Sequence, residues 1–290
     1  MQKYLETFVQ MISLRGLTDH TIRSYSTYIR AYLDYLETVL LKKPEDVSWQ
    51  ELRDFIIYIQ NERSLSDRTI NATISQLRFF TLYVLHQSWD PYQLPIRKFD
   101  VYLPFVPSKL EVVTFISSLK DLKQKAMVSL MYSAGLRIGE VCRLKCCDID
   151  RQNMRIYISK CKNRSARFVN LSPKLLPLLE EYWRTCGKPK VYLFPKQRKS
   201  DVERPIDSFY LPRHIKAHEE RLGWDRRLSC HSFRHAFGTH LYESGTDLLT
   251  IKTLLGHKSL LSTTIYIQLA TTITSSVTSP LDSLEDLNHV

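Results

Sequence analysis

Side chains that bind anions or transfer protons gather near the C-terminal end of this sequence. His231 and Arg234 lie three residues apart, and His257 and Tyr266 follow before residue 270. Arginine binds oxyanions through a planar fork of N–H donors, imidazoles exchange protons near neutral pH, and a phenol can act as a nucleophile. Together these four side chains suit chemistry at a phosphate group.

Short helices are expected to position these side chains. The spacing predicts a helix over about residues 230–244, with the first histidine and the arginine on one face. A second helix would end at Gly256, because glycine readily adopts the left-handed conformation that ends many helices, and would leave His257 in a turn. A third helix from about residue 262 would carry Tyr266 among apolar neighbours.

Each of these residues also has an ordinary structural interpretation. A histidine can be a hydrogen-bonded core group or a metal ligand, and a tyrosine between Ile265 and Ile267 can simply pack. The joint pattern, rather than any single residue, favours a common site.

The joint pattern resembles the tyrosine recombinases, the phage-integrase and Xer-like family of DNA strand-exchange enzymes. That family carries a His-x-x-Arg pair, a later Leu-Gly-His run and a tyrosine nine residues on, and His231 with Arg234, residues 255–257 and Tyr266 match in order. The resemblance implies a site-specific recombinase or integrase of the short, two-domain kind, acting in mobile-element integration, excision or resolution. A type IB topoisomerase-like relaxing enzyme and a catalytically silent architectural DNA-binding protein are the alternatives.

A Gly-Leu-Arg-x-x-Glu run lies earlier, at residues 135–140. By resemblance, Arg137 grips the scissile phosphate together with Arg234, and Glu140 supports the site. A surface salt bridge is the ordinary alternative for such an arginine. Attack on a phosphodiester gives five-coordinate phosphorus with extra negative charge, which fixed guanidinium groups can neutralise. The candidate site residues include no carboxylate cluster of the metal-binding kind, so we expect no metal and no other cofactor.

The resemblance also assigns the proton transfers. Tyr266 would attack phosphorus and form a 3′-phosphotyrosyl link. A phenol with a pKa near 10 is protonated at neutral pH, so a base must assist it. His231 is the candidate general base, and His257 would donate to a non-bridging oxygen. Lys162 would protonate the departing 5′ oxygen.

Lys162 lies in a predicted β-hairpin. Residues 154–160 alternate apolar and polar side chains, and residues 167–171 would form the second strand after a polar turn. By resemblance, a lysine in this turn reaches the minor groove of DNA. Lys162 matches the family position best, and Lys160 remains a rival because the turn lacks the family's usual glycines. Lys160 and Arg164 are also candidate DNA contacts, and a solvated basic hairpin tip is the ordinary alternative.

Composition agrees with a nucleic-acid partner without proving one. The chain has 290 residues and 43% hydrophobic residues, which suffices for two domains, and a net charge of +11 with an isoelectric point of about 9.3. Its six cysteines lack paired zinc-type spacing and are expected to be buried free thiols, as in a reducing cytoplasm. We expect no signal peptide and no membrane association, and a cytoplasmic, nucleoid-associated protein of a bacterium.

The N-terminal region, residues 1–92, reads as helices and, by resemblance, as a core-binding SAM-like DNA-binding domain. Apolar residues between 21 and 36 recur at steps of three and four, and Arg23 and Arg30 lie on another face that can meet phosphate. Two similar segments begin helices at about residues 19 and 67, and the second places Arg68 there. Helix starts bind phosphate well, although both segments can be ordinary caps.

Four prolines within residues 91–107, with the basic residues Arg97 and Lys98 between them, predict a basic linker at residues 93–108. A catalytic domain at 109–290 would follow it. We therefore expect a mainly α-helical fold with a small antiparallel β-sheet in the catalytic domain, and two domains that close around double-stranded DNA as a clamp. A helix near residues 208–221 adds Arg213 and Lys216 as candidate DNA contacts. By resemblance, the tail at 271–290 contacts a neighbouring protomer in a homo-tetramer of two dimers on DNA, although packing on its own domain is the alternative.

Overall fold

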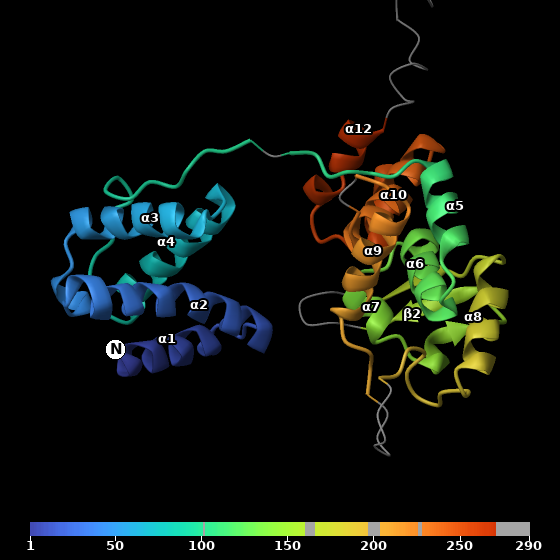
Figure 1. Cartoon of the computed structure of the whole chain (residues 1–290), viewed down its shortest axis with the longest axis horizontal. Coiled ribbons are helices and arrows are strands. Elements are labelled where there is room, and N and C mark those ends of the chain that lie inside the picture. Colours follow the sequence, from blue (N-terminus) through green and yellow to red (C-terminus); the bar gives the residue numbers. More distant parts are fainter. Residues whose placement is uncertain (101, 160–165, 197–203, 226–227, 271–290) are drawn as a thin grey trace, which may run out of the picture. The chain divides into compact units, whose positions relative to one another are not determined.

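A computed structural model describes residues 1–100, 102–159, 166–196, 204–225 and 228–270. The chain divides into two compact units, residues 1–102 and 103–290, whose elements are shown in Figure 1. Both are mostly helical, and the second unit also contains a three-stranded antiparallel sheet. The predicted fold class, mainly α with a small antiparallel sheet in the C-terminal part, is confirmed.

The N-terminal unit is a helical bundle around an aromatic core. Phe8, Phe55 and Phe80 are fully buried in it, and α2 packs against both α1 and α4. The predicted amphipathic seam of α2 faces this core through Ile29 and Tyr32. The helices are α1 (Gln2–Leu14), α2 (Asp19–Tyr35), α3 (Trp49–Arg63) and α4 (Asp67–Tyr83), with a π-helical turn at Leu36–Leu40 and a 3-10 turn at Pro44–Asp46.

Two helix starts in this unit are capped as predicted. The hydroxyl of Thr18 accepts from the backbone N–H of Thr21 at 3.2 Å, and that of Ser66 accepts from Thr69 at 3.4 Å. A hydroxyl at this position satisfies one N–H that the helix leaves without a partner. The candidate DNA contacts of this unit are all exposed; they are Arg23, Arg30 and Arg68.

The segment predicted as a linker begins and ends in contact with different cores. Leu94 is buried in the N-terminal core, and Phe105 and Val106 pack against the C-terminal core. Arg97, expected to supply positive charge to the linker, is paired with Asp67 at 3.0 Å. Its charge is therefore partly neutralised within the N-terminal unit.

The C-terminal unit is organised around the buried helix α6, which packs against α5, α7, α8, α9 and α10. Gly135 ends α6 in the left-handed conformation, so the chain turns directly into α7. The elements before the sheet are α5 (Lys109–Ser118), α6 (Leu122–Ala134), α7 (Ile138–Cys142) and a 3-10 turn at Cys146–Asp148. Those after it are α8 (Leu175–Thr185), α9 (Tyr210–Arg221), α10 (Cys230–Glu243), α11 (Leu248–Leu255), a 3-10 turn at Leu260–Ser262 and α12 (Ile265–Leu269).

The sheet has the order β1 (Ile149–Asp150), β2 (Arg155–Ile158) and β3 (Arg167–Asn170). The predicted hairpin is present, with Ile156 opposite Val169 on the buried face. Strand β1 was not predicted, because two residues are too short to show a period. The hairpin turn with Lys160, Lys162 and Arg164, and the tail at 271–290, lie outside the described residues.

Two exclusions apply to the described residues alone. No helix among them combines the length and apolar character needed to span a bilayer. Within the same part of the chain, no group of His, Cys, Asp and Glu side chains is arranged to hold a metal ion. The cysteine prediction was partly wrong, because Cys142 and Cys230 are buried thiols but Cys147 and Cys186 are exposed.

Candidate active site

Three guanidinium groups from three elements surround the carboxylate of Glu140. Arg167 on β3 donates from its two terminal nitrogens to both carboxylate oxygens, at 3.1 and 2.9 Å. Arg137, the residue before α7, donates from its side chain to Oε1 at 3.2 Å and from its backbone N–H to Oε2 at 2.9 Å. Arg234 on α10 lies 4.0 Å from Oε2. Glu140 thus links residues that are far apart in the sequence.

This cluster is buried and carries more positive than negative charge. Glu140 is 5% exposed, Arg234 3% and Arg167 9%. Burial works against ionisation of Glu140, but hydrogen bonds and charge from Arg167 and Arg137 outweigh it and lower its pKa to about 2. One carboxylate therefore faces three guanidinium groups. An anion such as a phosphate would offset the remaining positive charge.

The end of α11 fixes two of these guanidinium groups. The backbone oxygen of Leu255 accepts from Arg234 at 2.6 Å and from Arg137 at 3.2 Å. Arg234 also donates to the backbone oxygen of Gly135. Because backbone oxygens hold them, both arginines are oriented before any ligand arrives, which is the preorganisation that stabilises developing charge.

His257 lies in the predicted turn, directly after Gly256, which ends α11 in the left-handed conformation. Its Nδ1 is hydrogen-bonded to the hydroxyl of Thr263 at 3.0 Å. Burial and the nearby charges of Arg234 and Arg137 lower its pKa to about 4. The ring is therefore neutral at physiological pH.

Tyr266 on α12 is buried against α10. It is 1% exposed, and its ring lies parallel to that of His257, with 6.3 Å between centroids. A Cβ at Gly238 would come within 2.5 Å of the tyrosine ring carbon Cζ, so only glycine leaves room for the ring. Burial raises the pKa of Tyr266, and the charges of Arg234 and Arg137 act in the opposite direction. The phenol is protonated near neutral pH and lies within the electrostatic influence of two arginines.

His231 is exposed in the first turn of α10, one turn before the buried Arg234. A histidine that sequence reasoning did not identify, His235, lies between His231 and Tyr266, with ring centroids 5.9 and 6.1 Å away. Its buried Nδ1 has no hydrogen-bond partner in the described part of the chain. Its place four residues after His231, on the same helix face, was the signal that could have identified it.

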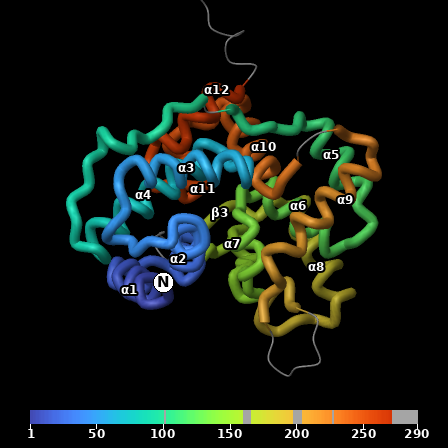
Figure 2. The backbone as a smooth tube through the Cα atoms, turned by 60° about the vertical axis from the view of Figure 1, so that its left-hand side comes forward, coloured from blue at the N-terminus to red at the C-terminus, as the bar shows by residue number. Residues whose placement is uncertain are grey.

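The chain after Asp247 folds back on α10. Helices α11 and α12 both pack against α10, and Figure 2 shows the three together. Ser229 and Asp247 cap α10 and α11 with their side chains. The caps set where α10 and α11 begin, and the packing of α11 and α12 on α10 brings the histidine turn and the tyrosine helix beside the arginine helix.

The remaining predicted residues lie apart from this cluster or outside the described residues. Arg213 and Lys216 are exposed on α9. Lys160, Lys162 and Arg164 belong to the hairpin turn that the structure does not describe.

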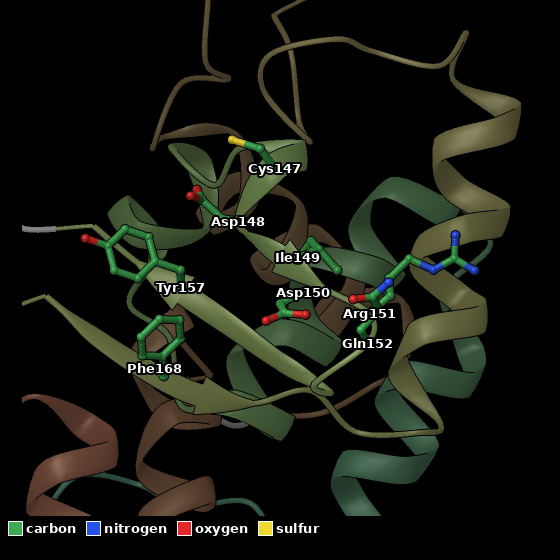
Figure 3. A pocket seen from close by; sticks show the side chains of 8 residues that line it. All are labelled: Cys147, Asp148, Ile149, Asp150, Arg151, Gln152, Tyr157 and Phe168. Carbon is green, nitrogen blue, oxygen red and sulfur yellow. The ribbon is translucent and has the colours of Figure 1, made fainter.

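A separate shallow hollow of about 650 Å³ lies on the outer face of the sheet. Figure 3 shows the rings of Tyr157 and Phe168 side by side there, with Asp148 and Asp150 beside them. Both carboxylates are already used locally: Asp148 accepts from the N–H of Lys145 at 2.8 Å, and Asp150 accepts from Asn153 and Arg155. The two carboxylates of this hollow are therefore engaged in local hydrogen bonds.

Fold and site together define a class. The chain is a two-unit, mostly helical protein whose C-terminal unit places a tyrosine beside a cationic cluster that suits a phosphate. Residues 109–272 match the model of the phage integrase family, and residues 4–91 match that of the phage integrase N-terminal SAM-like domain. The chain belongs to the phage integrase family.

Similar proteins agree with this assignment. A Sinorhizobium fredii protein named as integrase/recombinase y4qK is 38% identical, over 92% of this chain and 87% of its own length. A tyrosine recombinase of Pseudothermotoga lettingae is 29% identical, over 92% of this chain and 94% of its own. The solved structure of the Tn1549 transposon integrase in complex with circular intermediate DNA has a TM-score of 0.72 at 17% identity, covering 91% of this chain and 94% of that one. At that identity the likeness shows the fold.

Proposed function

We propose that this chain is a site-specific DNA recombinase that cuts and rejoins strands through a 3′-phosphotyrosyl intermediate, in the integration, excision or resolution of a mobile element. Its family consists of integrases and tyrosine recombinases, which are DNA-breaking and DNA-joining enzymes. The observation that carries the proposal is the buried, preorganised surplus of guanidinium groups beside Tyr266.

In the proposed reaction, the Tyr266 oxygen attacks the scissile phosphorus. The new O–P bond forms as the bond from phosphorus to the 5′ oxygen breaks, and the phenolic proton passes to His231. Lys162 gives a proton to the departing 5′ oxygen. Arg137 and Arg234 neutralise charge on the non-bridging oxygens. Preorganised donors of this kind each contribute about 10²–10³ in rate.

His257 would act as a neutral donor. Its depressed pKa keeps the ring uncharged at physiological pH, and its Nδ1 is committed to Thr263. The other ring nitrogen can then serve a non-bridging phosphate oxygen through a hydrogen bond, if Nδ1 accepts from the threonine hydroxyl.

The proposed partner is double-stranded DNA bearing recombination sites. We assign residues 1–92 to core binding, 93–108 to a linker and 109–290 to catalysis, with the two domains closing around the duplex as a clamp. Exposed arginines support this assignment in the N-terminal unit. We further propose a tetramer on DNA in which residues 271–290 contact a neighbouring protomer, and action at the bacterial nucleoid, where the substrate lies.

The test is trapping on a nicked suicide duplex that carries a candidate site. Wild-type protein is expected to become covalently attached to DNA, and Tyr266→Phe to give no adduct. Phenylalanine keeps the ring packed over Gly238, so the loss reports chemistry rather than folding. Tyr242→Phe is the matched control, because Tyr242 packs against the same apolar cluster, and its adduct should persist.

Three outcomes would contradict the proposal. An adduct that survives Tyr266→Phe would identify a different nucleophile. No adduct on any candidate site would favour a silent DNA-binding protein. Relaxation of a plasmid without recombination sites would favour a topoisomerase-like enzyme.

A further inference from the structure

We propose that Arg167 is a positioning residue for the cleavage reaction: through Glu140 it orients Arg137 and Arg234, and through the end of α11 it orients His257. This inference rests on the proposed function, because it concerns the same site. Arg167 begins the second strand of the predicted hairpin and was not a candidate site residue. Its side chain contacts both Glu140 and the end of α11, which hold the candidate catalytic groups.

The first contact is the fork of Arg167 on Glu140. Its two terminal nitrogens meet the two carboxylate oxygens at 3.1 and 2.9 Å, a bidentate arrangement that fixes the plane of the carboxylate. The same oxygens accept from the backbone N–H and the side chain of Arg137, and Oε2 lies 4.0 Å from Arg234. Arg167 therefore determines where Glu140 presents its charge to both phosphate-binding candidates.

The second contact is with the end of α11. The Nε of Arg167 donates to the backbone oxygen of Leu254 at 2.7 Å, and the next carbonyl, of Leu255, receives Arg137 and Arg234. A Cβ at Gly256 would lie 3.0 Å from a terminal nitrogen of Arg167 and 3.2 Å from its Cδ. The arginine thus passes directly beneath the residue before His257. Its rigid fork and its Nε hold the turn and the carboxylate at once.

Lysine cannot make both contacts. Its ammonium group is a single point on a flexible stem, whereas the guanidinium offers donors in fixed divergent directions. Arg167→Lys keeps the positive charge near Glu140 but loses the link to the carbonyl at residue 254 or one arm of the fork. Because Arg167→Lys keeps the charge and loses part of the geometry, its effect on the rate tests whether Arg167 positions the site.

The experiment measures DNA affinity and the rate of covalent adduct formation separately, at saturating protein on the nicked duplex. For Arg167→Lys we expect a rate about 10²-fold below wild type, because small misplacement of catalytic groups costs about this much, with DNA affinity within about threefold. Arg155→Lys is the matched control, since Arg155 lies on the neighbouring strand in an exposed ion pair with Asp150 at 2.9 Å. Its rate should stay within about twofold of wild type.

An Arg167→Lys rate within about threefold of wild type would overturn the inference, as would equal losses of affinity and rate. If Arg167→Lys does not fold, Arg167→Gln replaces it: glutamine can donate to one oxygen of Glu140, which stays paired with Arg137, and the same loss of rate without loss of affinity is expected. An Arg167→Gln variant that cleaves like wild type overturns the inference too. Failure of wild-type protein to form any adduct would instead contradict the proposed function.

Discussion

The two units of this protein differ in the charge of the polar side chains that they bury. Within the described residues, the buried polar side chains of the N-terminal unit are neutral; they are Ser26, Thr73 and Gln76. The C-terminal unit buries Glu140, Arg167, Glu219 and Arg234. Burying a charge costs several kcal/mol unless it is paired. Buried, paired charges in the C-terminal unit therefore favour a functional role for fixed charge there.

The difference suits two kinds of phosphate contact. Exposed arginines such as Arg23 and Arg68 are hydrated and screened, which suits a backbone contact that adds affinity and little orientation. Arg137 and Arg234 are held by backbone oxygens and act in a less polar environment, which suits one phosphate in one position. The comparison predicts that the same kind of substitution has very different effects in the two units.

The largest effect is expected at Arg234. Arg234→Lys cannot reproduce donation to the backbone oxygens of both Gly135 and Leu255, so the rate of adduct formation should fall by about 10²–10³, while binding of intact duplex changes little. Single-turnover cleavage and filter or gel binding measure the two quantities. A similar loss in cleavage rate and in binding would mean that Arg234 contributes to DNA affinity. It would contradict the proposed difference between buried and exposed arginines.

The effect of pH on the free energy of unfolding is expected to be intermediate in size. Burial, together with the charges of Arg234 and others, lowers the pKa of His235 and of His257 to about 4, below the ordinary 6.5. Between these values the unfolded chain binds protons that the folded chain does not. The free energy of unfolding of the C-terminal unit should therefore fall as pH drops from about 6.5 to about 4, by about 1 kcal/mol per pH unit for each histidine.

Denaturant unfolding of the whole chain across this pH range measures that slope. The double variant His235→Gln, His257→Gln should reduce the slope between pH 6.5 and 4.5, and His218 and His240, whose pKa values burial also lowers, supply part of what remains. Glu140 does not contribute in that interval, because its pKa is depressed to about 2 and its stabilisation is lost only as pH falls from about 4.5. An unchanged slope in the double variant would place the titrating groups elsewhere.

The smallest effect is expected at Arg68. Its side chain is exposed at the capped start of α4, so Arg68→Ala should weaken DNA binding by a few-fold and reduce the salt dependence by about one phosphate contact, without changing the cleavage rate at saturation. Arg53→Ala is the matched control, because Arg53 on α3 already donates to Gln50 and Gln93. Equal effects of both variants would argue against a phosphate contact at α4.

The sequence determined much that depends on local chemistry. The caps at Ser229 and Asp247 and the left-handed glycines at 135 and 256 are visible as residue types at helix boundaries, and the structure has them there. The alternation of residues 154–160 predicted the hairpin for the same reason. Helix ends and strand faces depend on neighbours within a few residues, which a sequence displays directly.

Only the tertiary structure decided what surrounds these elements. In the sequence, Arg167 is one polar residue of a strand, and only the fold brings it to Glu140 and Leu254. Folding likewise places the ring of His235 between those of His231 and Tyr266. The burial of Tyr266 over Gly238 is likewise a contact between distant residues. Hydrogen-bond partners, burial and the pKa shifts that follow depend on long-range packing, and one sequence does not display that packing.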